Sequence, residues 1–260
     1  MISVAVVGSG AIGSVVARSL QAAEVPGATL SGVICPNAPS GLPILPLTRA
    51  LEVSDLVVEA AGQQALAEIA PAVLDGGASL LVVSVGALCD EEVFKLLASA
   101  PPGRVHVTTG AVGGLDMLRS AARMGALCQV RIVTTKKPAA LVQPWMTASQ
   151  EAALRCATSP VEVRRGPAKE IARAFPASTN VAASVALAAG NWDLVEAVVM
   201  ADPDATMTSH VITASGDAGE YRFEIRNRPS PANPKTSAVV PFAVLKAIED
   251  IAGAAAWSFR

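Results

Sequence analysis

Apolar residues in the first hundred positions form short continuous runs, separated by stretches in which they recur at helical spacing. A continuous apolar run indicates a strand buried on both faces, and such strands alternating with helices form a parallel sheet. The pattern predicts strands over 2–7, 28–37, 55–62, 79–85 and 104–108, and helices over 12–20, 63–74 and 90–98, with Pro71 kinking or shortening the helix that contains it.

Beyond Thr109 the apolar and polar residues alternate instead. Alternation is typical of a sheet with one face on the core and one in water. We expect Ser178 or Thr179 to cap a helix that Gly190 ends. The pattern predicts strands over 129–135, 161–165, 207–214 and 221–228, the last two joined as a hairpin, and helices over 114–124, 179–189 and 236–256.

A glycine-rich turn, Gly8-Ser9-Gly10-Ala11-Ile12-Gly13, joins the first strand to the first helix. In this G-x-G-x-x-G arrangement the first glycine allows a tight turn, the second admits a pyrophosphate and the third lets the helix approach the strand. Ala11 and Ile12 lie where a helix N-terminus presents N–H groups to phosphates. A turn without a ligand is the alternative, but the strand and helix around it favour dinucleotide binding.

These patterns predict an α/β protein with an N-terminal Rossmann-type dinucleotide-binding domain and a second, mixed α+β domain for the substrate. Small residues at strand ends, Ala61 and Ser84 among them, would let a flat cofactor lie against the backbone. The boundaries are placed at 1–108 plus 236–260 for the first domain and 109–235 for the second, so that the last helix returns to the first domain.

The choice between NAD and NADP stays open. The second strand ends in Cys35-Pro36-Asn37, without the acidic residue that usually binds the adenosine ribose of NAD. No arginine follows at once to hold a 2′-phosphate, since Arg49 is the nearest. We therefore expect the protein to accept both cofactors.

Composition excludes some classes of partner. The chain of 260 residues is 52% hydrophobic and 3% aromatic, and its net charge of −2 comes without a basic block, which argues against nucleic acid. No apolar run is long and uninterrupted enough for a membrane span, and because Met1 leads directly into the first strand we expect no signal peptide. The four scattered cysteines suit a cytoplasmic protein, and we expect no metal site.

His210 is the leading candidate for chemistry, because it shares a strand face with Thr208 and titrates near neutrality. A hydrogen-bonded structural histidine is the alternative, and it is the favoured interpretation for His106. Lys136 and Lys137 end a strand and would hold a carboxylate, although exposed lysines are common there. Asn180 would bond a nicotinamide amide, or simply begin its helix. The glycine-rich turn 109–116 and the segment 233–237 are further candidates for cofactor and anion contacts.

Taken together, the chain resembles the L-aspartate dehydrogenase family nearly from end to end. The first glycine motif is widespread among dehydrogenases, but the later motifs in combination are fairly specific. The matching stretches are residues 8–13, 58–62, 84–88, 110–116, 136–138, 175–176, 180–182, His210 and 233–237.

The resemblance implies an NAD- or NADP-dependent homodimer that oxidises L-aspartate to iminosuccinate, which hydrolyses to oxaloacetate and ammonia, or that runs the reverse amination. In some members the iminosuccinate feeds NAD biosynthesis. By position, Ala111 and Asn180 would contact the cofactor and His210 would be the active-site residue. Our hypothesis places the nicotinamide near residues 84–87 and assigns the aspartate carboxylates to Lys137 and Thr236.

Other functions fit the same pattern. The first is another two-domain oxidoreductase, such as a homoserine or semialdehyde dehydrogenase or a cyclic-imine reductase. A semialdehyde enzyme needs a thiolate, and Cys89 is the only cysteine near the expected nicotinamide position. The second is a non-catalytic dinucleotide sensor, against which His210 and the lysine and 233–237 stretches argue.

Overall fold

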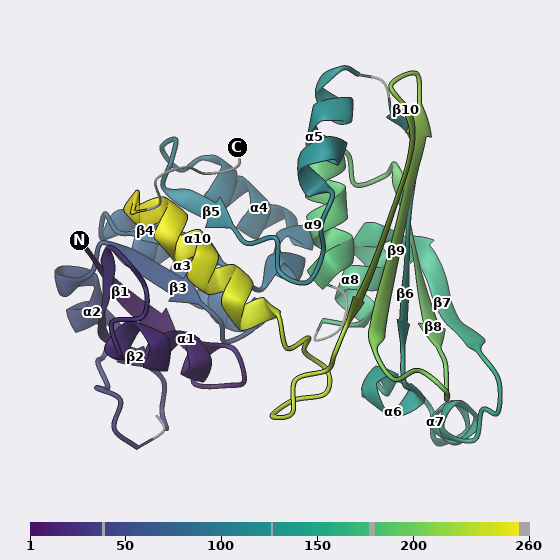
Figure 1. The fold of residues 1–260 in the computed structure, drawn as a ribbon, viewed down its shortest axis with the longest axis horizontal. Helices are drawn as coiled ribbons and strands as arrows, with labels where there is room; N and C mark the ends of the chain where they lie inside the picture. Colours follow the sequence, from purple (N-terminus) through teal and green to yellow (C-terminus); the bar gives the residue numbers. More distant parts are fainter. Residues whose placement is uncertain (38–39, 126, 177–179, 255–260) are drawn as a thin grey trace. The chain divides into compact units, whose positions relative to one another are not determined.

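The computed structural model divides into two compact units, Met1–Gly110 with Val240–Arg260, and Ala111–Val239. It describes residues 1–37, 40–125, 127–176 and 180–254. Among the helices described, none has both the length and the apolar character that crossing a bilayer requires. Each unit is built around one five-stranded sheet (Figure 1).

The sheet of the first unit is parallel throughout, in the order β2-β1-β3-β4-β5. Its central strands are buried at nearly every position, which explains their continuous apolar runs. The α/β fold and the Rossmann-type sheet are confirmed. The strands are β1 (Ile2–Val7), β2 (Ala28–Ile34), β3 (Leu56–Glu59), β4 (Ser79–Val82) and β5 (Val105–Val107).

The first unit departs from expectation at several elements. The sequence pattern does not predict α2 (Leu47–Val53), and the last helix begins at Val240 rather than at residue 236. Pro71 lies inside α3, but the helix continues to Asp75 and is not shortened. The fourth strand stops at Val82, because the chain turns into the 3₁₀ helix η1 (Val85–Cys89). α10 packs against α1 and β2 in this unit. The helices are α1 (Gly13–Gln21), α2 (Leu47–Val53), α3 (Gln63–Asp75), α4 (Glu91–Ala98) and α10 (Val240–Ala252).

The sheet of the second unit is mixed, in the order β10-β9-β6-β8-β7, with β6 and β8 parallel and the other pairs antiparallel. The expected hairpin is present, with Gly219 opposite Gly216. β8 lies beside β6, although its apolar run was not recognised as a strand in the sequence. The strands are β6 (Leu127–Lys136), β7 (Val161–Pro167), β8 (Val195–Ala201), β9 (Thr208–Gly216) and β10 (Gly219–Asn227).

Helices α5, α8 and α9 lie along one face of this sheet (Figure 1). They bury alternate residues of the strands, among them Ile132 and Ile212. The opposite face carries the polar residues of the alternation. Gly190, at φ +68°, ends α9 as expected, whereas the expected caps Ser178 and Thr179 lie outside the described residues. The helices are α5 (Leu115–Arg123), α6 (Pro138–Leu141), α7 (Ala148–Arg155), α8 (Ala168–Ala174) and α9 (Asn180–Ala189).

Candidate active site

The three glycines of the turn after β1 have the environments that a dinucleotide requires. A Cβ at Gly8, where φ is +96°, would lie 2.8 Å from the carbonyl oxygen of Ala60, and a Cβ at Gly13 would collide with the carbonyl oxygen of Gly8. Gly10 is exposed, and a Cβ there would meet no atom within 4 Å. The outer glycines thus allow the tight fold, while the space at Gly10 fits a pyrophosphate.

The first turn of α1 is also suited to an anion. Ile12 occupies the N-cap position and makes no side-chain capping hydrogen bond in the described structure, so the N–H groups that follow Ala11 are left without a side-chain cap. The Ser9 hydroxyl donates to the carbonyl of Asn37, 2.9 Å away, and so ties the segment after β2 to the glycine turn. Cys35 and Asn37 stand there in place of a ribose-binding carboxylate.

A buried carboxylate, Glu59, joins the ends of β3 and β4. One of its oxygens accepts the N–H groups of Ala61 and Gly62 and the hydroxyl of Ser84, each at 2.9 Å, and the other accepts the N–H of Ser84 at 3.0 Å. Because a Cβ at Gly8 would also lie 3.0 Å from the Cα of Ala61, the three expected cofactor residues Gly8, Ala61 and Ser84 form one rigid corner. Ala61 is exposed there, whereas Ser84 is buried.

In the second unit, the apolar rows on the helix-covered face of the sheet give way to polar residues at one end. Along β6, Ile132 is followed on the same face by Thr134 and Lys136, and along β9 the corresponding residue is His210, opposite Thr134. All are buried, with Thr134, Lys136 and His210 exposed by 2%, 5% and 2%. A buried polar cluster next to a packed core is expensive, and it is therefore a candidate for function.

Within this cluster, Thr134 orients the His210 ring, since its hydroxyl oxygen lies 3.1 Å from Nδ1. Burial and the positive charge of Lys136 lower the pKa of His210 to about 3. The imidazole is therefore neutral near pH 7. A neutral ring with Nδ1 engaged leaves Nε2 for proton transfer.

The two expected substrate residues, Lys137 and Thr236, have different surroundings. Lys137 is exposed and precedes α6. Its neighbour Lys136 is buried and donates from Nζ to the carbonyl of Lys235, 2.9 Å away. Lys235 and the part-buried Thr236 belong to the loop 229–237, which is closed by a hydrogen bond from the Ser230 N–H to the Thr236 carbonyl at 2.7 Å. The structure thus brings Lys136 and this loop together beside His210.

Ala111 and Asn180, the cofactor residues implied by resemblance, also lie in the second unit. The carbonyl of Ala111 accepts a hydrogen bond of 2.7 Å from the Asn227 side chain, and Asn227 pairs with Thr208 in the sheet, two residues before His210. Asn180 is the first residue of α9 and is partly buried. Ala111 is therefore held at the polar end of the sheet.

Sequence reasoning passed over Glu59, Lys136 and Asn227 as individual candidates. The alternation of side chains along a strand could have identified two of them from the sequence. It places Lys136 on the inward face of β6 with Ile132, and it places Asn227 on the inward face of β10. Glu59 was quoted within a motif, but only the structure shows its partners.

A parallel Rossmann-type sheet with this glycine turn, together with a mixed sheet holding a buried histidine and lysine, defines an NAD(P)-dependent dehydrogenase. Residues 8–109 match the family model described as "Homoserine dehydrogenase, NAD binding domain", and residues 116–251 match "Aspartate dehydrogenase, C-terminal". The second match covers more than half of the chain. The protein belongs to the L-aspartate dehydrogenase family, as its resemblance predicted.

Individual relatives agree with this assignment. The L-aspartate dehydrogenase of Methanopyrus kandleri is 34% identical over 264 residues, covering 95% of each chain. L-aspartate dehydrogenase 3 of Bordetella bronchiseptica is 35% identical over 255 residues, covering 94% of this chain and 93% of that protein. The crystal structure of aspartate dehydrogenase from Thermotoga maritima matches 100% of both chains with a TM-score of 0.74 at 23% identity, which shows the shared fold.

Proposed function

We propose that this enzyme oxidises L-aspartate to iminosuccinate, which hydrolyses to oxaloacetate and ammonia, or catalyses the reverse amination. The observation that carries the proposal is the buried polar cluster of Thr134, Lys136 and His210, which places a proton-transfer group beside a cation in a member of this family. Oxidation of an amino acid needs a group that moves a proton at the amine, and a positively charged site suits an acidic substrate.

The roles divide between the two units. Gly8, Gly10 and Gly13 with the first turn of α1 would hold the pyrophosphate, and Ala61 and Ser84 would support the nicotinamide. When bound, the cofactor supplies the acceptor for the hydride that leaves the substrate Cα. Ala111 and Asn180 stay predicted cofactor contacts, and Lys137 and Thr236 predicted substrate contacts.

His210 moves the proton in this proposal. Its Nε2 would take a proton from the substrate amine, or from the water that attacks the imine, while Thr134 keeps the ring oriented through Nδ1. Because the imidazole is neutral near pH 7, it enters the reaction as a base.

The direct test is to mix the purified protein with L-aspartate and NAD or NADP and follow the absorbance of the reduced cofactor. A panel of amino acids with each cofactor then gives the substrate and the cofactor preference. Oxidation of homoserine or of an aldehyde in place of aspartate would favour the other oxidoreductase, and binding of NAD without any turnover would favour a sensor. Cys89 is buried, so we expect thiol alkylation to spare activity.

The first prediction concerns His210. Replacing it by alanine should lower kcat by about 10² to 10⁴ if the ring transfers the proton. The dissociation constant of NADH should stay within about threefold, because the glycine turn lies in the other unit. Steady-state kinetics and a fluorescence titration with NADH measure the two quantities. An unchanged kcat would refute the role of His210.

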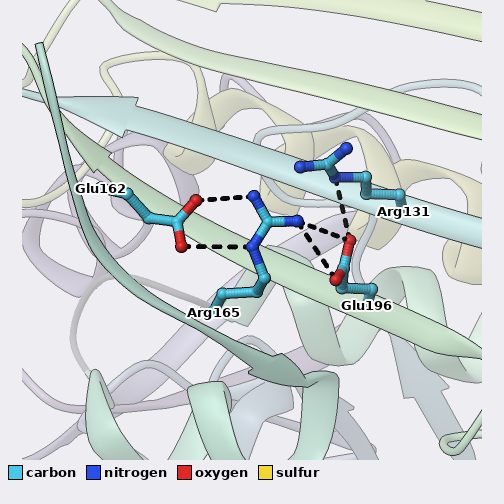
Figure 2. Close-up of polar contacts among 4 residues, drawn as sticks. All are labelled: Arg131, Glu162, Arg165 and Glu196. Atoms are coloured by element: carbon cyan, nitrogen blue, oxygen red, sulfur yellow. Dashed lines mark hydrogen bonds and ion pairs between the residues drawn. The ribbon is translucent and has the colours of Figure 1, made fainter.

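We also propose that the enzyme is a homodimer, formed through the face of the second sheet that no described helix covers. A strip of Val211, Val133 and Val198 runs across its middle in register. Val211 and Val133 are partly exposed, Val198 is buried, and charged residues surround the strip. Glu162, Arg165, Glu196 and Arg131 form a chain of ion pairs across β7, β8 and β6 (Figure 2).

This open face carries equal numbers of the two charges. A patch with an apolar centre and balanced charges can face its own copy around a two-fold axis, with arginine opposite glutamate. A second copy of the chain is therefore the occupant that fits. The charged residues are Arg131, Arg165, Arg222 and Arg226, with Glu162, Glu196, Glu220 and Glu224.

The second prediction tests the dimer by light scattering after size exclusion. The wild type should have twice the chain mass of 26.4 kDa. Val133→Arg, which places a charge in the strip, should be a monomer, whereas Val107→Arg on the exposed edge strand of the first unit should stay a dimer. A monomeric wild type would mean that this face meets another partner or none, and a dimeric Val133→Arg would place the interface elsewhere.

A supply of iminosuccinate to NAD biosynthesis is part of the proposal, because the family resemblance implies it for some members. A cytoplasmic location stays a prediction from the sequence.

A further inference from the structure

The ammonium group of Lys136 is buried at the end of β6 with only 5% of the residue exposed. Its position follows from the strand, since Lys136 continues the inward row of Val130, Ile132 and Thr134. Burying a charged group is unfavourable unless a partner of opposite charge compensates it. The question is therefore which anion compensates Lys136.

The described part of the chain offers none. Nζ donates to the carbonyl of Lys235, and no carboxylate of the described residues lies within ion-pair distance of it. Asp202 follows Ala201, which pairs with Lys136, but the Asp202 carboxylate accepts the N–H of Asp204 at 2.9 Å. An ammonium has three donors, of which this contact uses one.

The charges that do face Lys136 make an anion more favourable. Lys235 adds a second positive charge, and burial together with that charge lowers the pKa of Lys136 to about 8. His210 is coupled to Lys136 and is neutral near pH 7. The site thus holds uncompensated positive charge beside the proton-transfer group.

We propose that Lys136, rather than the exposed Lys137, binds a carboxylate of the substrate and that this carboxylate is its missing counterion. The inference rests on the proposed function for the nature of the substrate. It explains why a lysine is buried on the same sheet face as His210, next to Thr134. It also links the two groups, because a carboxylate at Lys136 would cancel the charge that opposes protonation of His210.

A purely structural role for Lys136 is the competing explanation, since its bond to Lys235 fastens the loop 229–237. The two roles differ in their response to Lys136→Met. This variant keeps the shape of the side chain and removes the buried charge, so it should fold at least as well as the wild type. Loss of a loop contact alone would lower thermal stability without abolishing anion binding.

The experiment measures succinate binding by calorimetry in the presence of saturating NADH. Succinate has two carboxylates and no amine, so above pH 7 its own charge is constant and any pH dependence belongs to the protein. Lys136→Met should weaken succinate binding by about 30-fold or more, as for a buried charge pair that loses one partner. Lys95→Met, an exposed lysine of α4, serves as the control and should bind like the wild type.

The pH profile provides a second readout. Wild-type affinity for succinate should fall as the pH rises above about 8, where Lys136 loses its proton, and Lys136→Met should not show this fall. Succinate binding by Lys136→Met within threefold of the wild type would overturn the inference. A loss confined to Lys137→Met would assign the carboxylate to Lys137.

Failure of the proposed function is distinguishable from failure of this inference. A wild type that binds succinate through Lys136 but does not oxidise aspartate would leave the anion site standing and refute the reaction. If the wild type oxidises aspartate and Lys136→Met keeps the same KM and the same succinate affinity, the reaction is supported and the anion site at Lys136 is refuted.

Discussion

Lys136 and Lys137 are adjacent in the sequence, yet one ammonium is buried and the other is exposed. The difference comes from the strand period, which sends successive side chains to opposite faces until α6 begins. His210 was predicted because a histidine titrates near neutrality and shares a strand face with Thr208. Lys136 was named only as half of a pair, because charge alone does not say which of two lysines is inside.

The third prediction compares two glycines of the same turn. Gly10→Ala should leave the free energy of unfolding within about 1 kcal/mol, since its Cβ meets no atom within 4 Å, but should weaken NADH binding at least tenfold. Gly13→Ala should lower stability instead, because its Cβ would collide with the Gly8 carbonyl. Urea unfolding and NADH titration separate the two effects. Equal loss of stability in both variants would contradict the assignment of Gly10 to the cofactor.

Elements were predictable where one pattern extended over a whole strand or helix. β6, β9 and β10 follow from their alternation, and β1 follows from its continuous apolar run. Asp90 begins the helix predicted over 90–98, and its side chain accepts hydrogen bonds from two N–H groups of α4. β8 was missed because its short apolar run, Ala197–Ala201 after Glu196, fits a buried strand or a buried helix equally well. Short helices such as α7 depend on a local capping box rather than on a long apolar face.

The fourth prediction concerns the link between β3 and β4. Glu59→Gln replaces one carboxylate oxygen by an NH₂ group, which cannot accept the N–H of Ser84 or of Ala61. We expect the free energy of unfolding to fall by about 1–3 kcal/mol, the cost of a buried group left unsatisfied. Urea unfolding without cofactor measures this, and NADH affinity should fall as well because the corner around Ala61 loosens. A variant as stable as the wild type would show that the amide finds other partners.

At the scale of the whole molecule, the sequence predicted both sheets and their order of appearance, but not the polar end of the second sheet. That site is assembled from β6, β9, β10 and the loop 229–237, which are up to about a hundred residues apart, as in the Lys136–Lys235 contact. Periodicity is a local property of the sequence, so it cannot show which strands are neighbours. The residue pairing of β9 with β6 and with β10 in the structure shows this.

The fifth prediction is a pH dependence of stability. His210 has a folded pKa of about 3 and an unfolded value of 6.5, so between these values only the unfolded chain binds a proton there. The contribution of His210 to the free energy of unfolding is complete above pH 6.5. It is lost as the pH falls toward 3, by up to about 1.4 kcal/mol per pH unit. His210→Gln should show a shallower decline in urea unfolding between pH 6.5 and 4. An identical slope would indicate that other groups control acid unfolding.

The contact between Lys136 and the Lys235 carbonyl has a consequence for how the enzyme could change its preferred substrate. The direction of the ammonium depends on a backbone oxygen of a surface loop, and that oxygen moves whenever the loop changes length or conformation. Insertions or exchanges between residues 229 and 237 would therefore re-aim the cation while every residue of the sheet stays the same. Selection for amino acids of different length would be expected to alter this loop first.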